Sequence, residues 1–333
     1  MAILNNSTYV DRTKAITLIP FKPNLISALG LFGEETSNAD SITFDERESR
    51  LVVLDDHLRN TDKKNGVDAS EYKTHLLPIP HYPMEGTITV KQLKGIRNFD
   101  TDVEQAIEGA VAEELEKQSE QHDNTLEYLQ ANMLCKGVLA TTNFGTIDMF
   151  SEFGVTKKTS EIDFSATASM ESQFRALTNQ IKKTYGGRLR GYVMLCGADF
   201  FDAFVSQEGI KEGYLVAGQN SPLRNELGEV ANGYVSFQYG NITLVQYDDV
   251  FNVKGSSVQP LADDEAVLLP RGSLGNVFFG PVSKLSGVGA SGAKRFASSY
   301  RDPKDRYVET ESEQNTLVVL QEIASVFYLT IKA

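Results

Sequence analysis

Residues 100–137 read DTDVEQAIEGAVAEELEKQSEQHDNTLEYLQANMLCKG, and this stretch decides the fold. Thr101 and Glu104 have the spacing of a capping box, which satisfies free backbone N–H groups at the start of a helix. Gly137 is a typical stop signal. Apolar side chains recur between them at helical spacing in two groups, Val103, Ile107, Val111 and Leu115, then Leu126, Leu129 and Met133. The pattern predicts a long spine helix over about residues 100–137 that is buried at its two ends.

The middle of this stretch, residues 116–125, carries no apolar side chain. A helix that is polar all round is typically exposed to solvent, and a break in the helix would give the same pattern. Both interpretations stay open at this point.

The segment before the spine, residues 41–95, predicts a long β-hairpin. SITFDERESRLVVLD (41–55) has strand character, and Asn65-Gly66 is a turn signal within a polar stretch. Three prolines, Pro78, Pro80 and Pro83, confine the returning segment to an edge strand or an unpaired ribbon. Because an isolated hairpin is marginally stable, we expect this one to contact a partner.

The first 40 residues predict an extended arm. Pro20 and Pro23 prevent a continuous helix. The apolar patches ITLIPF (16–21) and LISALGLFG (25–33) lie on either side of this break. The arm is too short to bury both patches by itself, so we expect it to pack on another surface.

The remainder of the chain predicts a compact α/β unit and a β-rich end. A helix is expected over about residues 167–185, with Phe174, Leu177 and Ile181 on one face. Residues 190–290 then alternate strands and a helix, and Gly240-Asn241 is a hairpin signal. The expected elements are a strand at 192–196, a helix at 198–205, strands on both sides of Gly240-Asn241, strands at 265–270 and 276–280, and a β-rich segment at 317–333 that returns to the spine region.

Composition limits the classes of function. The chain has 333 residues, 41% of them hydrophobic, and a formal net charge of −13. It has no basic run of four residues, so direct binding to DNA phosphates is not expected, whereas an acidic wall around nucleic acid is compatible with the charge. No apolar run is long enough for a membrane span, and no signal peptide is expected. Two cysteines without a CxxC motif fit a reducing cytosol.

The candidate chemical motifs are weak. GVGASG (287–292) matches the dinucleotide pattern G-x-G-x-x-G, but Pro303 and its neighbours argue against the long helix which that pattern needs. The four histidines have no metal-ligand spacing, and the acidic pairs fit solvated turns better than cation sites. We therefore expect no catalytic residue, cofactor or metal. The residues considered are His57, His75, His81, His122, Cys135, Cys196, Asp248, Asp249, Asp263, Asp264 and Glu265.

The order of segments, and four particular stretches, resemble the lambda-type phage capsid protein E family. The similar stretches cover most of the chain beyond about residue 40: LLPIPHYPMEGTITVKQLKGIRNF (76–99), FQYGNITLVQYDDVF (237–251), AVLLPRGSLGNVFFGPV (266–282) and YRDPKDRYVETESEQNTLVVLQ (300–321). The resemblance implies an α+β, HK97-like capsid fold. Its parts would be an N-terminal arm (1–40), an extended E-loop (41–95), a P domain with the spine helix (96–189), a compact A domain (190–289) and a C-terminal return to the P domain (290–333).

The resemblance also implies function and partners. The chain would self-assemble into hexamers and pentamers of an icosahedral shell around double-stranded DNA, without sequence-specific binding. Scaffold, portal and a decoration protein would be partners, and assembly would take place in the host bacterial cytoplasm before the protein becomes part of the virion. Some relatives crosslink a loop lysine to a neighbour's asparagine, but the lambda-type pattern argues against such crosslinking here.

Ten residues are expected to contact neighbouring subunits: Ile19, Phe21, Leu25, Leu29, His57, Arg59, Lys63, Lys64, Tyr72 and Tyr82. Two alternatives remain beside a phage capsid protein. One is the shell protein of a cellular nanocompartment with the same fold. The other is an uncharacterised α/β enzyme.

Overall fold

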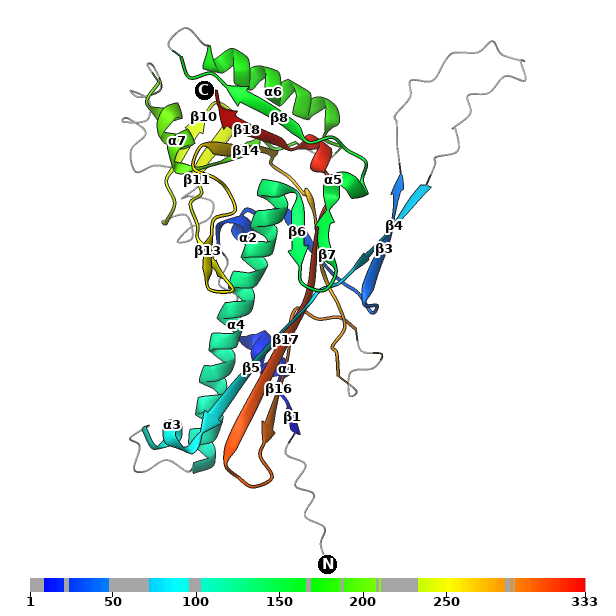
Figure 1. Ribbon diagram of the computed structural model, residues 1–333, viewed down its shortest axis with the longest axis vertical. Helices are drawn as coiled ribbons and strands as arrows, with labels where there is room; N and C mark the ends of the chain where they lie inside the picture. Colours follow the sequence, from blue (N-terminus) through cyan, green and yellow to red (C-terminus); the bar gives the residue numbers. More distant parts are fainter. Residues whose placement is uncertain are drawn as a thin grey trace, which may run out of the picture.

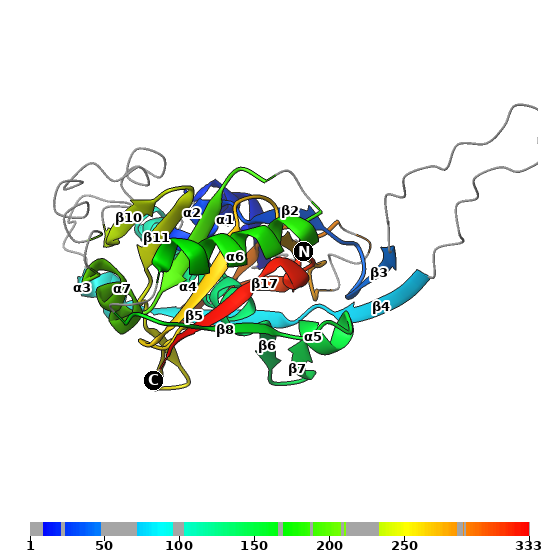
Figure 2. The same ribbon diagram turned by 90° about the horizontal axis from the view of Figure 1, so that it is seen from above.

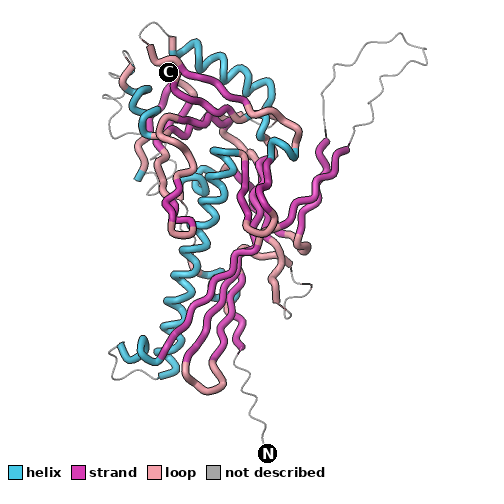
Figure 3. Tube along the Cα trace, in the orientation of Figure 1, coloured by secondary structure: helices cyan, strands magenta, loops and turns pink. Residues whose placement is uncertain are grey.

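The computed structural model describes residues 9–20, 24–47, 72–95, 103–165, 169–186, 189–207, 210, 233–284, 289 and 291–332. Within these residues a long helix lies beside a long sheet, a second sheet with its helices sits at one end, and a pair of strands projects from the body (Figure 1). Helices and strands are mixed along the chain (Figure 3), which confirms the predicted α+β class.

The spine helix is α4 (Val103–Lys136), a continuous helix of 34 residues. At a rise of 1.5 Å per residue it is about 50 Å long. It ends where the sequence indicates, because Gly137 adopts a left-handed φ of 71° and its N–H donates to the carbonyl of Met133. A Cβ atom at Gly137 would also lie 2.3 Å from the ring of Phe150, so only glycine fits.

The polar middle of α4 is unbroken and is exposed on one face only, so the expectation that the helix is buried only at its ends is wrong. Gln118, Ser119, His122 and Asp123 are all buried. They face polar side chains of the neighbouring sheet instead of solvent. The prediction failed because it assumed that polar residues face water. Here the buried polar residues make hydrogen bonds inside the protein.

A long mixed sheet lies against α4 and is built around β17 (Tyr307–Leu320). Residues 308–313 of β17 pair with both β16 and β5, so these two strands lie on opposite edges of β17. β15 pairs with the later part of β17, and β1 and β2 complete the sheet. The bounds are β1 Tyr9–Asp11, β2 Phe32–Thr36, β5 His81–Thr89, β15 Gly275–Phe279 and β16 Phe296–Arg301.

The second sheet forms the core of the upper unit. Its order is β10-β11-β9-β14-β18-β8. α6 (Met170–Thr184) and α7 (Ala198–Val205) pack on one face, and the side chains of the other face join the core around the upper end of α4 (Figure 2). The strands are β8 Lys158–Ile162, β9 Tyr192–Cys196, β10 Ser236–Tyr239, β11 Ile242–Gln246, β14 Glu265–Pro270 and β18 Phe327–Ile331.

Several predicted elements of this unit are confirmed. β9, α7 and β14 have the predicted bounds, and β10 and β11 form the hairpin around Gly240-Asn241. The face of α6 with Phe174, Leu177 and Ile181 is buried as predicted.

The assignment of strands to units was wrong in three places. The strand expected at 276–280 is β15, which belongs to the long sheet and not to the unit at 190–290. β8 and β18, from outside that range, join the upper sheet. Buried apolar strands have the same sequence pattern in either sheet, so their pairing could not be read from the chain order.

The projecting ribbon consists of β3 (Ser41–Arg47) and β4 (Tyr72–Pro78), paired antiparallel. It points away from the body in both views (Figures 1 and 2). The predicted hairpin is thus confirmed at its base. Its later segment is not part of the ribbon, because β5 turns back into the body and pairs with β17 along nine residues.

The arm is not an extended segment. It forms helices and contributes side chains to the core of its own subunit. It forms α1 (Thr13–Leu18) and α2 (Leu25–Leu29), separated at the predicted proline break, and then β2. The apolar side chains that the sequence left without a partner are buried in the same subunit: Ile16, Leu25, Ile26 and Leu31. Long-range packing on α4 and the long sheet supplies the surface that the arm lacks locally.

Smaller elements connect these parts. The β6–β7 hairpin and α5 follow the spine, and the β12–β13 hairpin hangs below the upper sheet (Figure 1). Their bounds are α3 Val90–Gly95, β6 Val138–Thr141, β7 Gly145–Asp148, α5 Met149–Glu152, β12 Phe251–Val253, β13 Ser256–Val258 and the 3₁₀ turn η3 Ile323–Ser325.

Candidate subunit interface

The groups considered for chemistry do not form a reactive site. Both cysteines are buried and free. Burial raises the pKa of Cys135 to about 12 and raises the pKa of Cys196 as well, so neither is a thiolate nucleophile near neutral pH. Among the described residues, no three His, Cys, Asp or Glu side chains come together as metal ligands.

The remaining motifs have structural explanations. Asp249 accepts a hydrogen bond of 2.6 Å from the hydroxyl of Tyr234, and Asp263 accepts one from Gln259. The G-x-G-x-x-G stretch is followed by strand β16, whereas a dinucleotide site needs a helix there. A Cβ atom at Gly292 would lie 2.2 Å from the carbonyl oxygen of Phe279, so this glycine serves close backbone packing. No described helix is long and apolar enough to cross a membrane.

The structure places four of the predicted contact residues within their own subunit. Leu25 has no exposed surface in its own subunit, and its role at a subunit contact stays a prediction. Leu29 and Tyr82 are half-buried against the main core, and Ile19 is half-buried beside α1. The three half-buried side chains keep some surface for a partner.

The other predicted contact residues are not tested. Tyr72 begins β4, but its side chain is not described. Five lie outside the described residues: Phe21, His57, Arg59, Lys63 and Lys64.

The projecting ribbon is anchored to the body by one face of β4. Leu77 belongs to the main core. His75 is buried, its ring centroid lies 5.3 Å from that of Phe153, and its Nδ1 lies 3.5 Å from a carboxylate oxygen of Glu152. Leu76 lies on the other face and is 65% exposed. A strand pair with a fixed base and an exposed apolar side chain can contact a second molecule.

Exposed apolar side chains also occur away from the ribbon. Leu18, at the end of α1, is 82% exposed, and Val103, at the start of α4, is 69% exposed. The sequence did not predict that these residues are exposed, because an apolar residue in an amphipathic pattern is expected to be buried. Exposure of an individual apolar side chain was visible only in the structure.

The long sheet presents an acidic face on the side opposite α4. A cleft of about 270 Å³ there is lined by Tyr9, Glu85, Ser298, Tyr300, Glu309 and Glu311. Lys284 forms an ion pair of 2.7 Å with Glu311 at its border. The cleft carries negative charge and little apolar surface, so it is unlike a pocket for an apolar small molecule.

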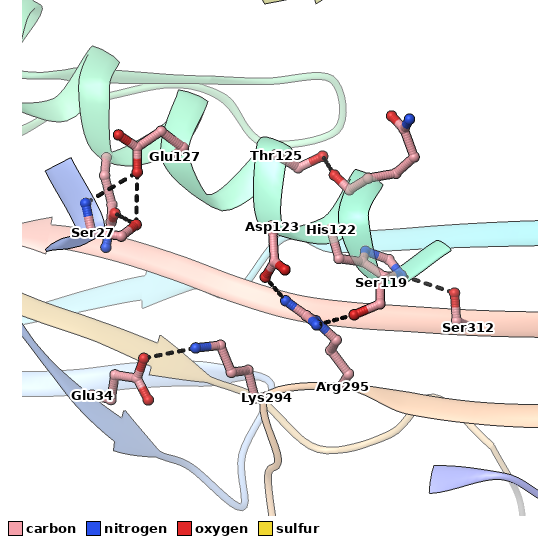
Figure 4. A network of polar contacts seen from close by, with 12 residues as sticks. Ser27, Glu34, Ser119, His122, Asp123, Thr125, Glu127, Lys294, Arg295 and Ser312 are labelled. Carbon is pink, nitrogen blue, oxygen red and sulfur yellow. Dashed lines mark hydrogen bonds and ion pairs between the residues drawn. The ribbon is translucent and has the colours of Figure 1, made fainter. Parts of the chain in front are cut away.

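The face of the sheet toward α4 carries a second kind of polar surface. We call it the spine seam: Gln118, Ser119, His122 and Asp123 of α4 with Arg295, Thr310 and Ser312 of the sheet side. Figure 4 shows all of these residues except Gln118 and Thr310. Arg295 forms an ion pair with Asp123 and donates to the hydroxyl of Ser119. His122 lies 2.9 Å from Ser312, and Gln118 donates to Thr310 over 3.1 Å.

Burial dominates the electrostatics of the spine seam. It lowers the pKa of His122 to about 4, with a further contribution from the charge of Arg295, so this imidazole is neutral near pH 7. Burial also lowers the pKa of Arg295 to about 10, which leaves the guanidinium charged. The seam therefore contains one buried ion pair and a neutral histidine, with no exposed reactive atom.

The described residues thus offer exposed apolar side chains and an acidic cleft for contact with another molecule. The sequence profile of the family described as phage major capsid protein E matches residues 9–331. The chain belongs to that family. It is therefore a major capsid protein, a structural component of the phage virion, and the alternative of an α/β enzyme is wrong.

Relatives with similar sequences extend over nearly the whole chain. The chain is 27% identical to the major capsid protein of Pseudomonas phage KPP10, over 96% of this chain and 95% of that protein. It is 23% identical to the major capsid protein of Salmonella phage Felix O1, over 92% and 91%. The predicted relationship to phage capsid proteins is confirmed.

Solved structures show the same fold. A prophage protein of Escherichia coli CFT073, described as a capsid protein, has a TM-score of 0.63 at 15% identity and covers 97% of this chain and 99% of its own. The mature capsid of bacteriophage PhiM1 has a TM-score of 0.52 at 8% identity, with 93% and 88% covered. The HK97-like capsid fold predicted for this major capsid protein is thereby confirmed.

Proposed function

We propose that this capsid protein assembles with copies of itself, as hexamers and pentamers, into an icosahedral shell that encloses double-stranded DNA. The observation that carries the proposal is the β3–β4 ribbon. Its base is fixed by the buried Leu77 and His75, and the rest projects where only another molecule can cover it. A two-stranded ribbon gains stability when a partner covers it.

The charge of the chain suits a container for DNA. With a net charge of −13, its surface repels the phosphate backbone, so packaged DNA would be enclosed without being bound tightly. The acidic cleft beside Glu309 and Glu311 is also available for a basic surface of a neighbour. We further propose that scaffold, portal and decoration proteins take part, and that assembly occurs in the host bacterial cytoplasm.

Electron microscopy of the purified chain tests the proposal, with size-exclusion chromatography alongside. Closed particles, sheets or tubes are expected, with scaffold co-expressed if the chain alone remains a monomer. Deleting Thr61–Ser70, between the two strands of the ribbon, should leave a folded subunit that no longer forms shells.

A matched variant distinguishes the effect of the segment's length from the effect of its side chains. Replacing residues 61–70 with ten Gly and Ser residues keeps the length of the segment and removes its side chains. Loss of shells in both variants would assign the contact to side chains of the segment. Shells of normal yield from the deletion would contradict a role of the hairpin in assembly.

A further inference from the structure

The face of β17 that lies against α4 carries a row of four polar side chains. They occupy alternate positions of the strand and therefore point to the same face of the sheet: Thr310, Ser312, Gln314 and Thr316. The three hydroxyl side chains have no exposed surface, and Gln314 is 1% exposed. All four therefore depend on partners inside the protein for their hydrogen bonds.

The first two members of the row have partners on α4. Gln118 donates to the Thr310 hydroxyl over 3.1 Å. The ring of His122 lies 2.9 Å from the Ser312 hydroxyl (Figure 4). Four residues of a helix rise about 6 Å and two residues of a strand rise about 6.6 Å, so one residue per helical turn keeps pace with every second residue of β17.

The last two members of the row face a different part of α4. One turn beyond His122 the helix presents apolar side chains, and Leu126 and Leu129 belong to the main core. Within the described residues, both amide atoms of Gln314 and the hydroxyl of Thr316 are buried without a hydrogen-bond partner. The polar row on β17 thus extends two residues beyond the polar side chains of α4 that bind it.

The chemistry of these two side chains fits a water molecule. The Gln314 amide offers donors and an acceptor, and the Thr316 hydroxyl can both donate and accept. Buried waters typically make two to four hydrogen bonds to such groups. The two Cα atoms are about 6.6 Å apart along the strand, a separation that one water spans with two hydrogen bonds of about 2.8 Å. A cation fits less well, because neither side chain carries negative charge.

We propose that Gln314 and Thr316 bind an ordered, buried water molecule between β17 and α4. The water lies at the boundary between the spine seam and the apolar core around Leu126. It satisfies polar groups of the strand that the apolar part of the helix cannot satisfy. This inference concerns one subunit and does not depend on shell formation.

Solution NMR of the full-length, unassembled chain tests the site. Threonine methyl groups are labelled, and the nuclear Overhauser effect (NOE) from water to each methyl is measured. The Thr316 methyl should show a water NOE. Thr310 is the internal control, because it is equally buried and its hydroxyl has a direct partner in Gln118, so its methyl reports only transfer through its own hydroxyl. An NOE at Thr316 that is no larger than that at Thr310 would overturn the proposal.

Two matched variants test the role of the amide. Gln314→Leu removes both amide atoms and keeps a side chain of similar size, so the water NOE at Thr316 should be lost. Gln121→Leu makes the same change on the exposed face of α4 and should leave that NOE as in the wild type. A water NOE at Thr316 that persists in Gln314→Leu would contradict binding by Gln314.

A crystal structure of the wild-type subunit gives a second test that does not depend on whether Gln314→Leu folds. We expect electron density for a water within hydrogen-bond distance of both the Gln314 amide and the Thr316 hydroxyl. A direct hydrogen bond between these two side chains, with no density for water beside them, would overturn the proposal.

Discussion

The upper unit and the spine seam bury a helix against a sheet in opposite ways. In the upper unit the contact is aromatic, with the rings of Phe174 and Phe204 5.6 Å apart and those of Phe204 and Tyr239 5.4 Å apart. In the spine seam the contact consists of hydroxyls, amides and the Arg295–Asp123 ion pair (Figure 4). Both contacts are buried, yet only one is apolar.

This difference shows which role each interface has, that of the upper unit and that of the spine seam. Apolar burial stabilises in proportion to the area removed from water and does not depend on direction. A buried ion pair adds little net stability over an apolar substitute, but it requires its own partner at one position. The upper unit therefore supplies stability, and the spine seam fixes the position of α4 along the sheet.

The largest expected effect is in the apolar interface. Phe200→Ala, on α7, removes a ring with no exposed surface and should reduce the free energy of unfolding by about 3–5 kcal/mol. Denaturant unfolding of the unassembled subunit measures this. Phe144→Ala, at the exposed β6–β7 turn, is the matched control and should cost less than about 1 kcal/mol. Equal losses from both variants would contradict the assignment of this aromatic cluster as a stabilising core.

The next effect breaks the ion pair of the spine seam. Arg295→Met leaves the buried Asp123 without its cation and should cost about 3 kcal/mol. The double variant Arg295→Met with Asp123→Leu makes this part of the seam apolar and should recover most of that loss. Chemical denaturation measures both. Failure of the double variant to recover stability would show that the ion pair itself is a net source of stability.

The smallest effect depends on pH. Because the pKa of His122 is lowered to about 4 in the folded protein and is near 6.5 when unfolded, the unfolded chain binds the proton first as the pH falls. The contribution is fully present above about pH 6.5 and should decline by about 2 kcal/mol between pH 6.5 and pH 5, at 1.36 kcal/mol per pKa unit.

Thermal unfolding across this pH range checks the prediction. His122→Gln, which can still form a hydrogen bond with Ser312, should flatten the dependence. His81→Gln changes a partly exposed histidine on β5 and should leave the dependence as in the wild type. A slope that remains in His122→Gln would assign the acid sensitivity to another group.

Much of the fold could be predicted from local patterns. The periodic apolar residues located α4, and the turn at Gly240-Asn241 located a hairpin, because both signals act over a few residues. Pro78, Pro80 and Pro83 indicated an edge strand or an unpaired ribbon, and β5, which contains Pro83, is an edge strand that pairs with β17. The candidate interface stays a prediction, since the described contact residues Ile19, Leu25, Leu29 and Tyr82 all pack within their own subunit and no neighbour is present.

The sequence by itself determined the elements, the family and the absence of a recognisable catalytic motif, because these depend on residue type and short spacing. The tertiary structure alone decided which elements the buried residues pack against. Leu25 is covered by α4, the polar middle of α4 is covered by β17, and Glu127 reaches α2 from one hundred residues away. Such contacts join segments that carry no local signal for one another, so only the folded chain reveals whether a polar residue faces water or a buried partner.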